Sequence, residues 1–132
     1  MPNELNTDGY KLGFRKMIMY PDLSITGRLY GGMLLSWIDE AMAMLAMDTM
    51  HTQRIVTKKI SEVNFKSPAL LGDLLEIWGK ETSRGRTSLT MEGKVLVKRD
   101  LDEGSKFADI CEFSVVFVAL DELGKPVAWE LK

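Results

Sequence analysis

The chain has 132 residues, 45% of them hydrophobic, and a formal net charge of −2 at pH 7. This length supports a single domain spanning 1–132 and is short for two, while the slightly acidic charge argues against a broad nucleic-acid-binding surface. The start of the chain lacks the basic and apolar runs of a signal peptide, and acidic residues interrupt the only apolar stretch near membrane-spanning length. We therefore expect a cytoplasmic protein that binds neither nucleic acid nor membrane.

The first half of the sequence predicts one short strand and one long helix. Residues 1–12 are mostly polar and are expected to be a loose lead-in, and residues 13–20 predict a strand that ends at a proline. Within 33–47 nearly every residue is Met, Leu, Ile, Ala or Trp. This pattern predicts a helix that begins near Gly31, ends within 49–52 and is buried on all sides.

The second half alternates between apolar and polar residues and predicts four longer strands. The predicted strands are 55–65, 74–83, 87–98 and 107–120, with turns at 67–73, 84–86 and 101–105. Short turns imply antiparallel pairing, so we expect an α+β fold in which an antiparallel sheet wraps around one long central helix. The uncovered sheet face and the sheet edges predict a homo-oligomer with a dimer as its smallest unit.

An acidic pair, Asp39 and Glu40, lies inside the apolar helix. Aspartate is a poor helix former and an unpaired buried carboxylate is costly, so Asp39 is a candidate for function, either as a general base that activates water or as a nucleophile. The alternative is an inert carboxylate that accepts a hydrogen bond from a hydroxyl such as that of Ser36, one turn away. Glu40 points about 100° away around the helix and is expected to face solvent or an interface.

The helix begins with a pair of glycines, Gly31 and Gly32. Without side chains, this end lets a ligand approach the first unpaired backbone N–H groups, which carry partial positive charge and could polarise a carbonyl oxygen. At about 1.5 Å per residue, however, Asp39 lies roughly 12 Å from Gly31, too far for both to act on one group of atoms. If they act together, they come from different subunits packed antiparallel, which again predicts an oligomer.

Other side chains allow both a functional and a structural interpretation. Methionines of the helix could line an adaptable acyl tunnel, although at helical spacing they more often form ordinary core; they are Met33, Met42, Met44, Met47 and Met50. Cys111, the only cysteine, is expected to be a buried thiol on a strand. His51, the only histidine, follows the helix and is expected to cap its C-terminus. No cluster has the spacing of a metal site, and no Ser–His–Asp triad is expected.

Three motifs occur in an order that resembles a known family. The first is the glycine pair with MLLSWID, which ends at Asp39. The second is a strand and turn made by Val56 and Thr57 through Val63, then Phe65, Pro68, Gly72 and Asp73. The third is the stretch Gly85, Arg86, Thr87 and Ser88. Together they cover about residues 19–126 and resemble the hotdog fold and, more narrowly, the YciA-like acyl-CoA thioesterases.

This resemblance implies an acyl-CoA thioesterase in which Asp39 is catalytic and the backbone near Gly31 and Gly32 of a neighbouring subunit polarises the thioester carbonyl. Ser24 stands where relatives commonly have an asparagine that helps to orient the catalytic water, and Tyr30 where many have His or Phe. No metal and no organic cofactor are implied, because coenzyme A is part of the substrate and product. The resemblance also implies a hexamer built of dimers.

The resemblance assigns coenzyme A binding to the third motif. In the family, a hairpin of glycine, threonine and serine contacts the coenzyme, which points to Gly85, Thr87 and Ser88. Lys and Arg form charge-assisted hydrogen bonds to phosphate, and the candidates are Arg54, Lys58, Lys59, Arg84, Arg86, Lys98 and Arg99. We favour Arg84 and Arg86, which flank the hairpin, and include Lys58; most other charged residues on the strands are expected to face solvent.

Two alternatives remain open. A non-catalytic hotdog module would bind acyl-CoA or a related metabolite without hydrolysing it, and Ser24 in place of the usual asparagine favours this alternative. A purely structural oligomer would require Asp39 to be an inert core residue and predicts no response to coenzyme A. Dehydratases and hydratases of the hotdog fold place a catalytic histidine near the start of the central helix, where this chain has none, so their chemistry is not expected.

Overall fold

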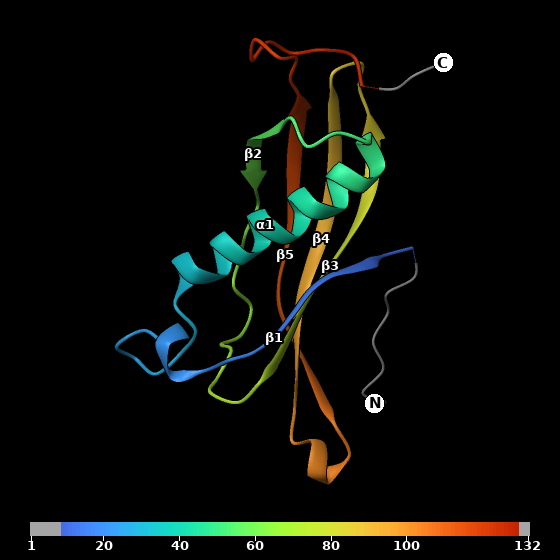
Figure 1. Ribbon diagram of the computed structural model, residues 1–132. Helices are drawn as coiled ribbons and strands as arrows, with labels where there is room; N and C mark the ends of the chain where they lie inside the picture. The colour runs from blue at the N-terminus through green and yellow to red at the C-terminus, as the bar shows by residue number, and fades with distance from the viewer. Residues whose placement is uncertain (1–8, 130–132) are drawn as a thin grey trace.

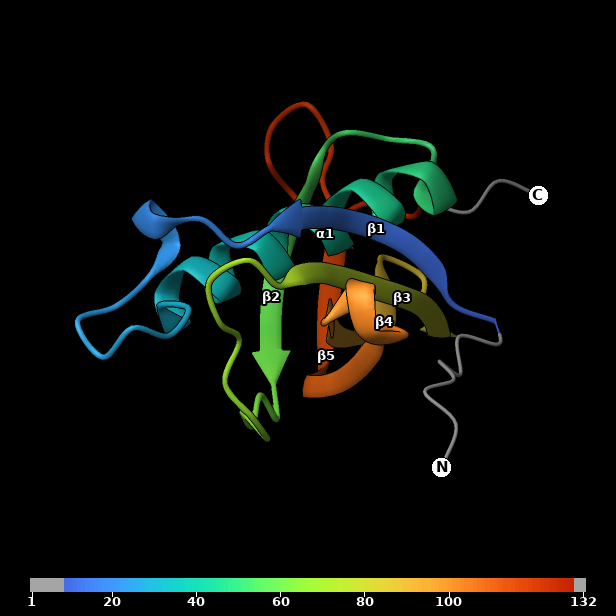
Figure 2. The same ribbon diagram turned by 90° about the horizontal axis from the view of Figure 1, so that it is seen from below.

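A computed structural model describes residues 9–129, which form one five-stranded sheet and one long helix (Figure 1). All neighbouring strands are antiparallel, in the order β1-β3-β4-β5-β2. In chain order the elements are β1 (Lys11–Met17), the short 3₁₀-helix η1 (Tyr20–Asp22), α1 (Gly31–Met50), β2 (Ile55–Ser61), β3 (Leu74–Arg84), β4 (Ser88–Arg99), the short 3₁₀-helix η2 (Leu101–Glu103) and β5 (Lys106–Ala119). Figure 2 shows the sheet curving around the helix. The predicted α+β fold is therefore confirmed.

The helix α1 forms because its apolar residues recur three and four positions apart along one face. Its buried residues are Leu34, Trp37, Ile38, Ala41, Met42, Ala46 and Met50. It ends at His51, which takes a left-handed φ of 55° as the expected C-cap. The expectation that α1 is buried on all sides is wrong for the single chain, because Leu35 is 39% exposed and Met44 is 50% exposed. Only one face of the helix meets the sheet. Leu35 and Met44 lie about 180° apart around the helix axis, and the uncovered face is the one that carries Met44 and the half-buried Met47, opposite the buried Met42 and Ala46.

The hydrophobic core lies between α1 and the concave face of the sheet. Alternate residues of the central strands point inward, and the fully buried ones include Leu75, Ile77, Val97, Val115 and Phe117. Cys111 belongs to this layer, as expected, and burial raises the pKa of its thiol to about 12. A side chain at Gly93 would collide with the ring of Phe113, which crosses β4 at this point. Only glycine therefore fits at this position of the strand.

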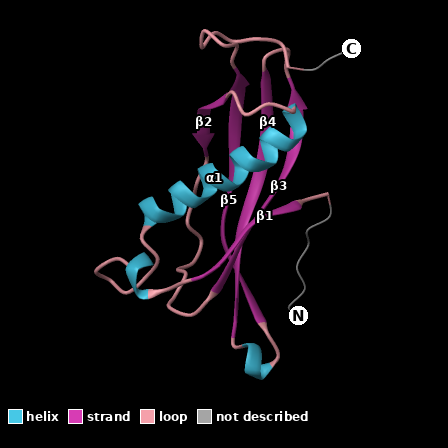
Figure 3. Cartoon of the chain, viewed as in Figure 1, coloured by secondary structure: helices cyan, strands magenta, loops and turns pink. Residues whose placement is uncertain are grey.

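The five predicted strands are present, but several of their ends differ from the predictions. β1 begins at Lys11 and stops at Met17, because the next residues turn into η1. β2 stops at Ser61 rather than at residue 65, since Glu62 takes a positive φ of 60° and the chain leaves the sheet as the loop 62–73 (Figure 3). Residues 1–8 of the expected lead-in lie outside the described residues, whereas Lys11 and Leu12 already belong to β1.

The edges of the sheet are β1 and β2. Edge strands present backbone groups that can pair with another chain, and β2 also exposes Val56, whose accessible fraction is 44%. β2 and the uncovered face of α1 are therefore surfaces on which a second copy could pack. Within residues 9–129, no helix is long and apolar enough to cross a membrane.

Candidate active site

Asp39 lies in the middle of α1 and is half-buried rather than buried. The hydroxyl of Thr57 donates a hydrogen bond to Asp39 Oδ1 at 2.5 Å. Thr57 pairs with the buried Phe117 across the β2–β5 ladder, a register that turns its side chain toward the helix. The structure thus corrects the expected partner, because Ser36 is exposed and the carboxylate is held by a strand instead. An oriented, partly accessible carboxylate can accept a proton from a bound water.

The start of α1 has no side-chain cap. Its N-cap residue is Tyr30. The backbone N–H of Tyr30 donates to the carbonyl of Asp22 at 2.9 Å, and its side chain makes no capping hydrogen bond. The next two N–H groups, those of Gly31 and Gly32, have no hydrogen-bond acceptor within residues 9–129. Unpaired N–H groups at a helix start carry partial positive charge, so this end can bind the oxygen of a polarised carbonyl.

The two glycines at the helix start lie next to two aromatic rings. A Cβ at Gly32 would lie 2.8 Å from the ring of Tyr30, and a Cβ at Gly31 would lie 3.6 Å from the ring of Phe65. Only the contact at Gly32 is too short for a side chain, and the Tyr30 ring that makes it is exposed and can move aside. Eight residues separate Gly31 from Asp39 on one straight helix, about 12 Å at its usual rise, so the structure does not bring these two groups together within one chain.

The residues predicted to bind coenzyme A form one hairpin between β3 and β4. Gly85 N–H donates to the carbonyl of Ser88 at 2.9 Å, and the backbone of Arg86 accepts a hydrogen bond from Trp129 at 3.3 Å. Arg84 is exposed, bonds to Glu81 through two nitrogens at 2.5 and 2.8 Å and lies over the ring of Trp129. The structure thus gathers Arg84, Gly85, Arg86, Thr87 and Ser88.

A cavity of about 620 Å³ lies beside this hairpin, between its Arg84, the C-terminal end of α1 and the final described segment. Arg54, another predicted phosphate ligand, also lines the cavity, but so do Asp121 and Glu122, which offset the positive charge. Lys58 is exposed at the irregular register of β2, and no contact within residues 9–129 joins it to the hairpin.

Ser24 lies in the loop before α1, and its hydroxyl and backbone N–H both bond to residues of the same loop. Its hydroxyl lies 2.8 Å from that of Thr26, and its backbone N–H donates to the carbonyl of Arg28 at 2.7 Å. No contact in the described part of the chain joins Ser24 to Asp39. Within one subunit, therefore, this serine closes a tight turn.

The remaining candidates divide between core and surface. Met42 and Met50 are core residues, Met33 and Met47 are half-buried, and Met44 is exposed. Met44 and Met47 line one open cavity beside the end of α1 and Met50 lines another, so the five methionines do not form one continuous tunnel within residues 9–129. Glu40 is exposed, as expected. Across residues 9–129, no three His, Cys, Asp or Glu side chains gather closely enough to hold a metal ion.

Sequence reasoning missed Thr57 as the partner of Asp39. The two residues are 18 positions apart on different elements, and the pairing depends on the register of β2 against the helix. The only signal was a hydroxyl residue in an alternating strand, which is too common to single out. The helix neighbour Ser36 was the residue that spacing alone could find.

A single long helix enclosed by a curved antiparallel sheet is the hotdog architecture, which solved thioesterases share. Residues 26–102 match the family model of the thioesterase superfamily, and the chain belongs to that superfamily.

Known proteins of this class are similar to the chain over most of its length. The acyl-CoA thioester hydrolase YciA of Salmonella typhimurium is 32% identical over 123 residues, which are 92% of this chain and 91% of that protein. An aspartate-to-alanine mutant of a hexameric, broad-specificity acyl-coenzyme A thioesterase superposes with a TM-score of 0.86 at 27% identity, covering 92% of this chain and 88% of the other. A hexameric hotdog-fold thioesterase of Campylobacter jejuni superposes with a TM-score of 0.82 at 28% identity, and the match covers 90% of each chain. The resemblance seen in the sequence is thereby confirmed.

Proposed function

We propose that the chain hydrolyses acyl-CoA thioesters to a free carboxylic acid and coenzyme A. The observation that carries this proposal is the joint presence, on one helix, of an uncapped glycine start and of Asp39, held by Thr57. An oxyanion site and a base are the two parts that acyl transfer to water requires. The names of similar proteins, acyl-CoA thioester hydrolase and acyl-coenzyme A thioesterase, support the same chemistry.

In the proposed reaction, Asp39 takes a proton from a water molecule as the water oxygen attacks the thioester carbonyl carbon. The N–H groups of Gly31 and Gly32 of a neighbouring subunit stabilise the negative charge that develops on the carbonyl oxygen. The carbon–sulfur bond then breaks, and the thiolate of coenzyme A leaves and takes up a proton. The alternative route, in which Asp39 attacks the carbon and forms a mixed anhydride that water then cleaves, gives the same products.

The hairpin Arg84–Ser88 is the proposed contact for coenzyme A, with Lys58 as a further cation. Arg84 and Arg86 are exposed, and guanidinium groups suit phosphate. We propose that Ser24 can assist the water only across a subunit interface, because within its own chain its hydroxyl lies against Thr26. The reaction as proposed needs neither a metal nor an organic cofactor.

The proposed site needs at least a dimer, because Gly31 and Asp39 of one chain cannot act on the same atoms. Similar structures are described as hexameric, and the uncovered face of α1 and the edge strand β2 support assembly here. We therefore propose a hexamer made of three dimers, in which the dimer carries the site.

The test is release of thiol from acyl-CoA substrates with short, long, branched and aromatic acyl groups. A colorimetric thiol reagent suits this protein because its only cysteine, Cys111, is buried and stays protonated. Turnover on any of these substrates supports the proposal. No turnover, together with a raised melting temperature in the presence of acyl-CoA, would favour the non-catalytic binding module instead.

A further inference from the structure

A mainly apolar cavity of about 300 Å³, whose lining also includes Arg28 and Ser67, opens beside the first turn of α1. Its floor is made by Leu34 and Ile110, which are 1% and 2% exposed. The loop 62–73 contributes a wall that includes Phe65 and Pro68. Phe65 is 53% exposed and its ring lies against the backbone of Gly31, so it stands where the cavity meets the unpaired N–H groups of the helix.

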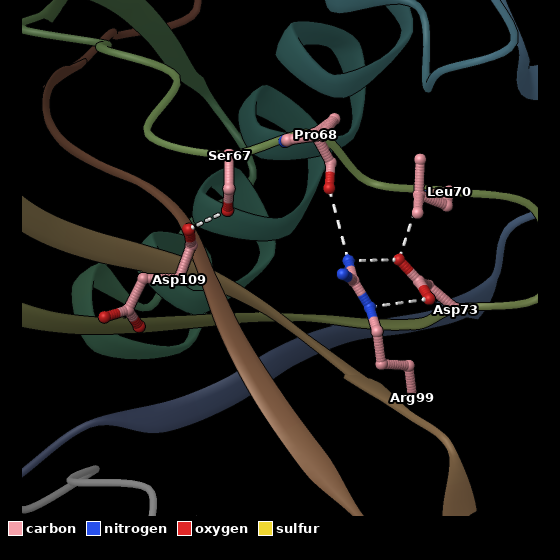
Figure 4. Close-up of polar contacts among 6 residues, drawn as sticks. All are labelled: Ser67, Pro68, Leu70, Asp73, Arg99 and Asp109. Carbon is pink, nitrogen blue, oxygen red and sulfur yellow. Dashed lines mark hydrogen bonds and ion pairs between the residues drawn. The ribbon is translucent and has the colours of Figure 1, made fainter.

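The wall of this cavity is fixed by an ion pair behind it. The guanidinium of Arg99 donates to both carboxylate oxygens of Asp73, at 3.1 and 2.8 Å, and to the carbonyl of Pro68 at 3.2 Å (Figure 4). The Asp73 side chain is 5% exposed and also accepts the backbone N–H of Leu70 at 2.9 Å. Two parallel hydrogen bonds between a guanidinium group and a carboxylate fix the relative orientation of the two side chains.

The same loop is tied to β5 on its other side. Ser67 donates to the carbonyl of Asp109 at 2.6 Å (Figure 4), and the backbone N–H of Lys66 donates to the carbonyl of Ile110 at 2.7 Å. These contacts hold the loop on both sides and fix the part of the cavity wall that Ser67, Pro68 and Ala69 form.

We infer that Phe65 is a specificity-determining residue that limits the acyl groups this cavity accepts, and that Arg99, through Asp73 and Pro68, positions the cavity wall. The inference rests on the proposed function, because a carbonyl held at Gly31 directs its alkyl substituent into the nearest apolar space. At roughly 30 Å³ for a group the size of a water molecule, this open cavity of about 300 Å³ corresponds to about ten carbon atoms. Straight alkyl chains of short to medium length are the class that fits.

Binding of stable thioether analogues tests this inference without requiring hydrolysis. S-(2-oxoalkyl) coenzyme A compounds of increasing chain length, which keep a carbonyl but have no thioester bond, are titrated calorimetrically into the wild-type oligomer. Each added methylene should tighten binding about fourfold until the cavity is full, and further carbons should then add nothing. Affinity that does not depend on chain length, or no binding at all, would overturn the inference. Length-dependent binding without thiol release would instead reject only the proposed function.

Phe65→Ala should shift the limit to longer or branched alkyl groups, changing the ratio of long-chain to short-chain affinity at least tenfold. The matched control is Phe107→Ala, which removes a half-buried phenylalanine that packs against Lys98 and does not line the cavity. Unchanged chain-length profiles in both variants, with the proteins folded, would contradict the role of Phe65.

Arg99→Lys keeps the charge but loses the forked contact with Asp73. The affinity for the analogue with the longest accepted chain should fall about tenfold, so that affinity depends less on chain length, while the affinity for coenzyme A itself should change little. Arg15→Lys is the control, because Arg15 makes a comparable 2.8 Å pair with the buried Glu76 on another part of the sheet. A merely structural role for Arg99 would make the two variants behave alike, which would overturn the positioning role.

Discussion

The carboxylate of Asp39 is oriented by a residue from another element, the hydroxyl of Thr57. Without this hydrogen bond the carboxylate could rotate away from the water molecule of the proposed reaction. The orientation of the Asp39 carboxylate thus depends on the register of β2 as much as on the helix.

The first prediction concerns this contact. Thr57→Val keeps the shape of the side chain and removes the donor, so kcat should fall roughly tenfold to a hundredfold while the fold is retained. Thiol release and circular dichroism measure the two effects. Thr82→Val removes an exposed hydroxyl that bonds to the carbonyl of Thr90 and should leave kcat unchanged; equal rates for both variants would show that Thr57 does not position the base.

At this scale, sequence reasoning locates residues better than it locates their partners. Asp39 stands out because it interrupts an apolar helix, and Gly31 and Gly32 because they precede it. The bond to Thr57 could not be predicted, because it depends on the three-dimensional register of a strand. The cavity wall at Phe65 was also hidden, since that residue was assigned to a strand and lies in the loop 62–73.

Among the elements, the segment leading into α1 is held by a buried acid. Asp22 is 6% exposed and accepts hydrogen bonds from the backbone N–H of Met19 and from Lys16, both at 2.9 Å. Burial alone would raise the pKa of this carboxyl. The two hydrogen bonds lower the pKa by more than burial raises it, so the pKa of Asp22 lies below its ordinary value. The backbone carbonyl of Asp22 accepts a hydrogen bond from the backbone N–H of Tyr30, and this bond positions the start of the helix.

The second prediction follows from that lowered pKa. Because the unfolded-state pKa of an aspartate is about 3.9 and the folded-state value is lower, Asp22 stabilises the fold above that pH, and this stabilisation is lost as the pH falls through the folded-state pKa. The free energy of unfolding, measured with urea from about pH 6 to about pH 2, should therefore fall more steeply in wild type than in Asp22→Asn. Asp102→Asn, at an exposed site in η2, should keep the wild-type slope. Equal slopes in all three proteins would contradict the prediction.

Most of the fold could be predicted from hydrophobic periodicity. The helix pattern of α1 and the alternation of β3, β4 and β5 extend over many residues, so their presence is clear and only their ends move by a few positions. The end of β2 was missed because Glu62 adopts a positive φ, a conformation that its residue type does not signal. The exposed face of α1 was also missed, since a pattern that is apolar all round does not say which face lacks a partner within the chain.

For the whole molecule, that exposed face of α1 is an apolar surface that assembly could bury. Our third prediction is that Met44→Glu, which places a charge on the uncovered side of α1, lowers the mass of the oligomer measured by light scattering. Leu123→Glu is the control, because Leu123 is 83% exposed in a turn beyond β5, and it should leave the mass unchanged. A Met44→Glu protein with the mass of the wild type would place the interface elsewhere.

The measurement that tests the central claim most directly is thiol release by Asp39→Asn on the best acyl-CoA substrate, beside Asp48→Asn. Asp48 is an exposed aspartate on the same helix, so it controls for the amide substitution itself. Loss of the base should lower kcat by at least about a hundredfold, while the oligomer persists and the free energy of unfolding is unchanged or higher, because a partly buried charge is removed. An Asp39→Asn enzyme that stays within tenfold of the wild-type rate would contradict the assignment of Asp39 as the catalytic residue.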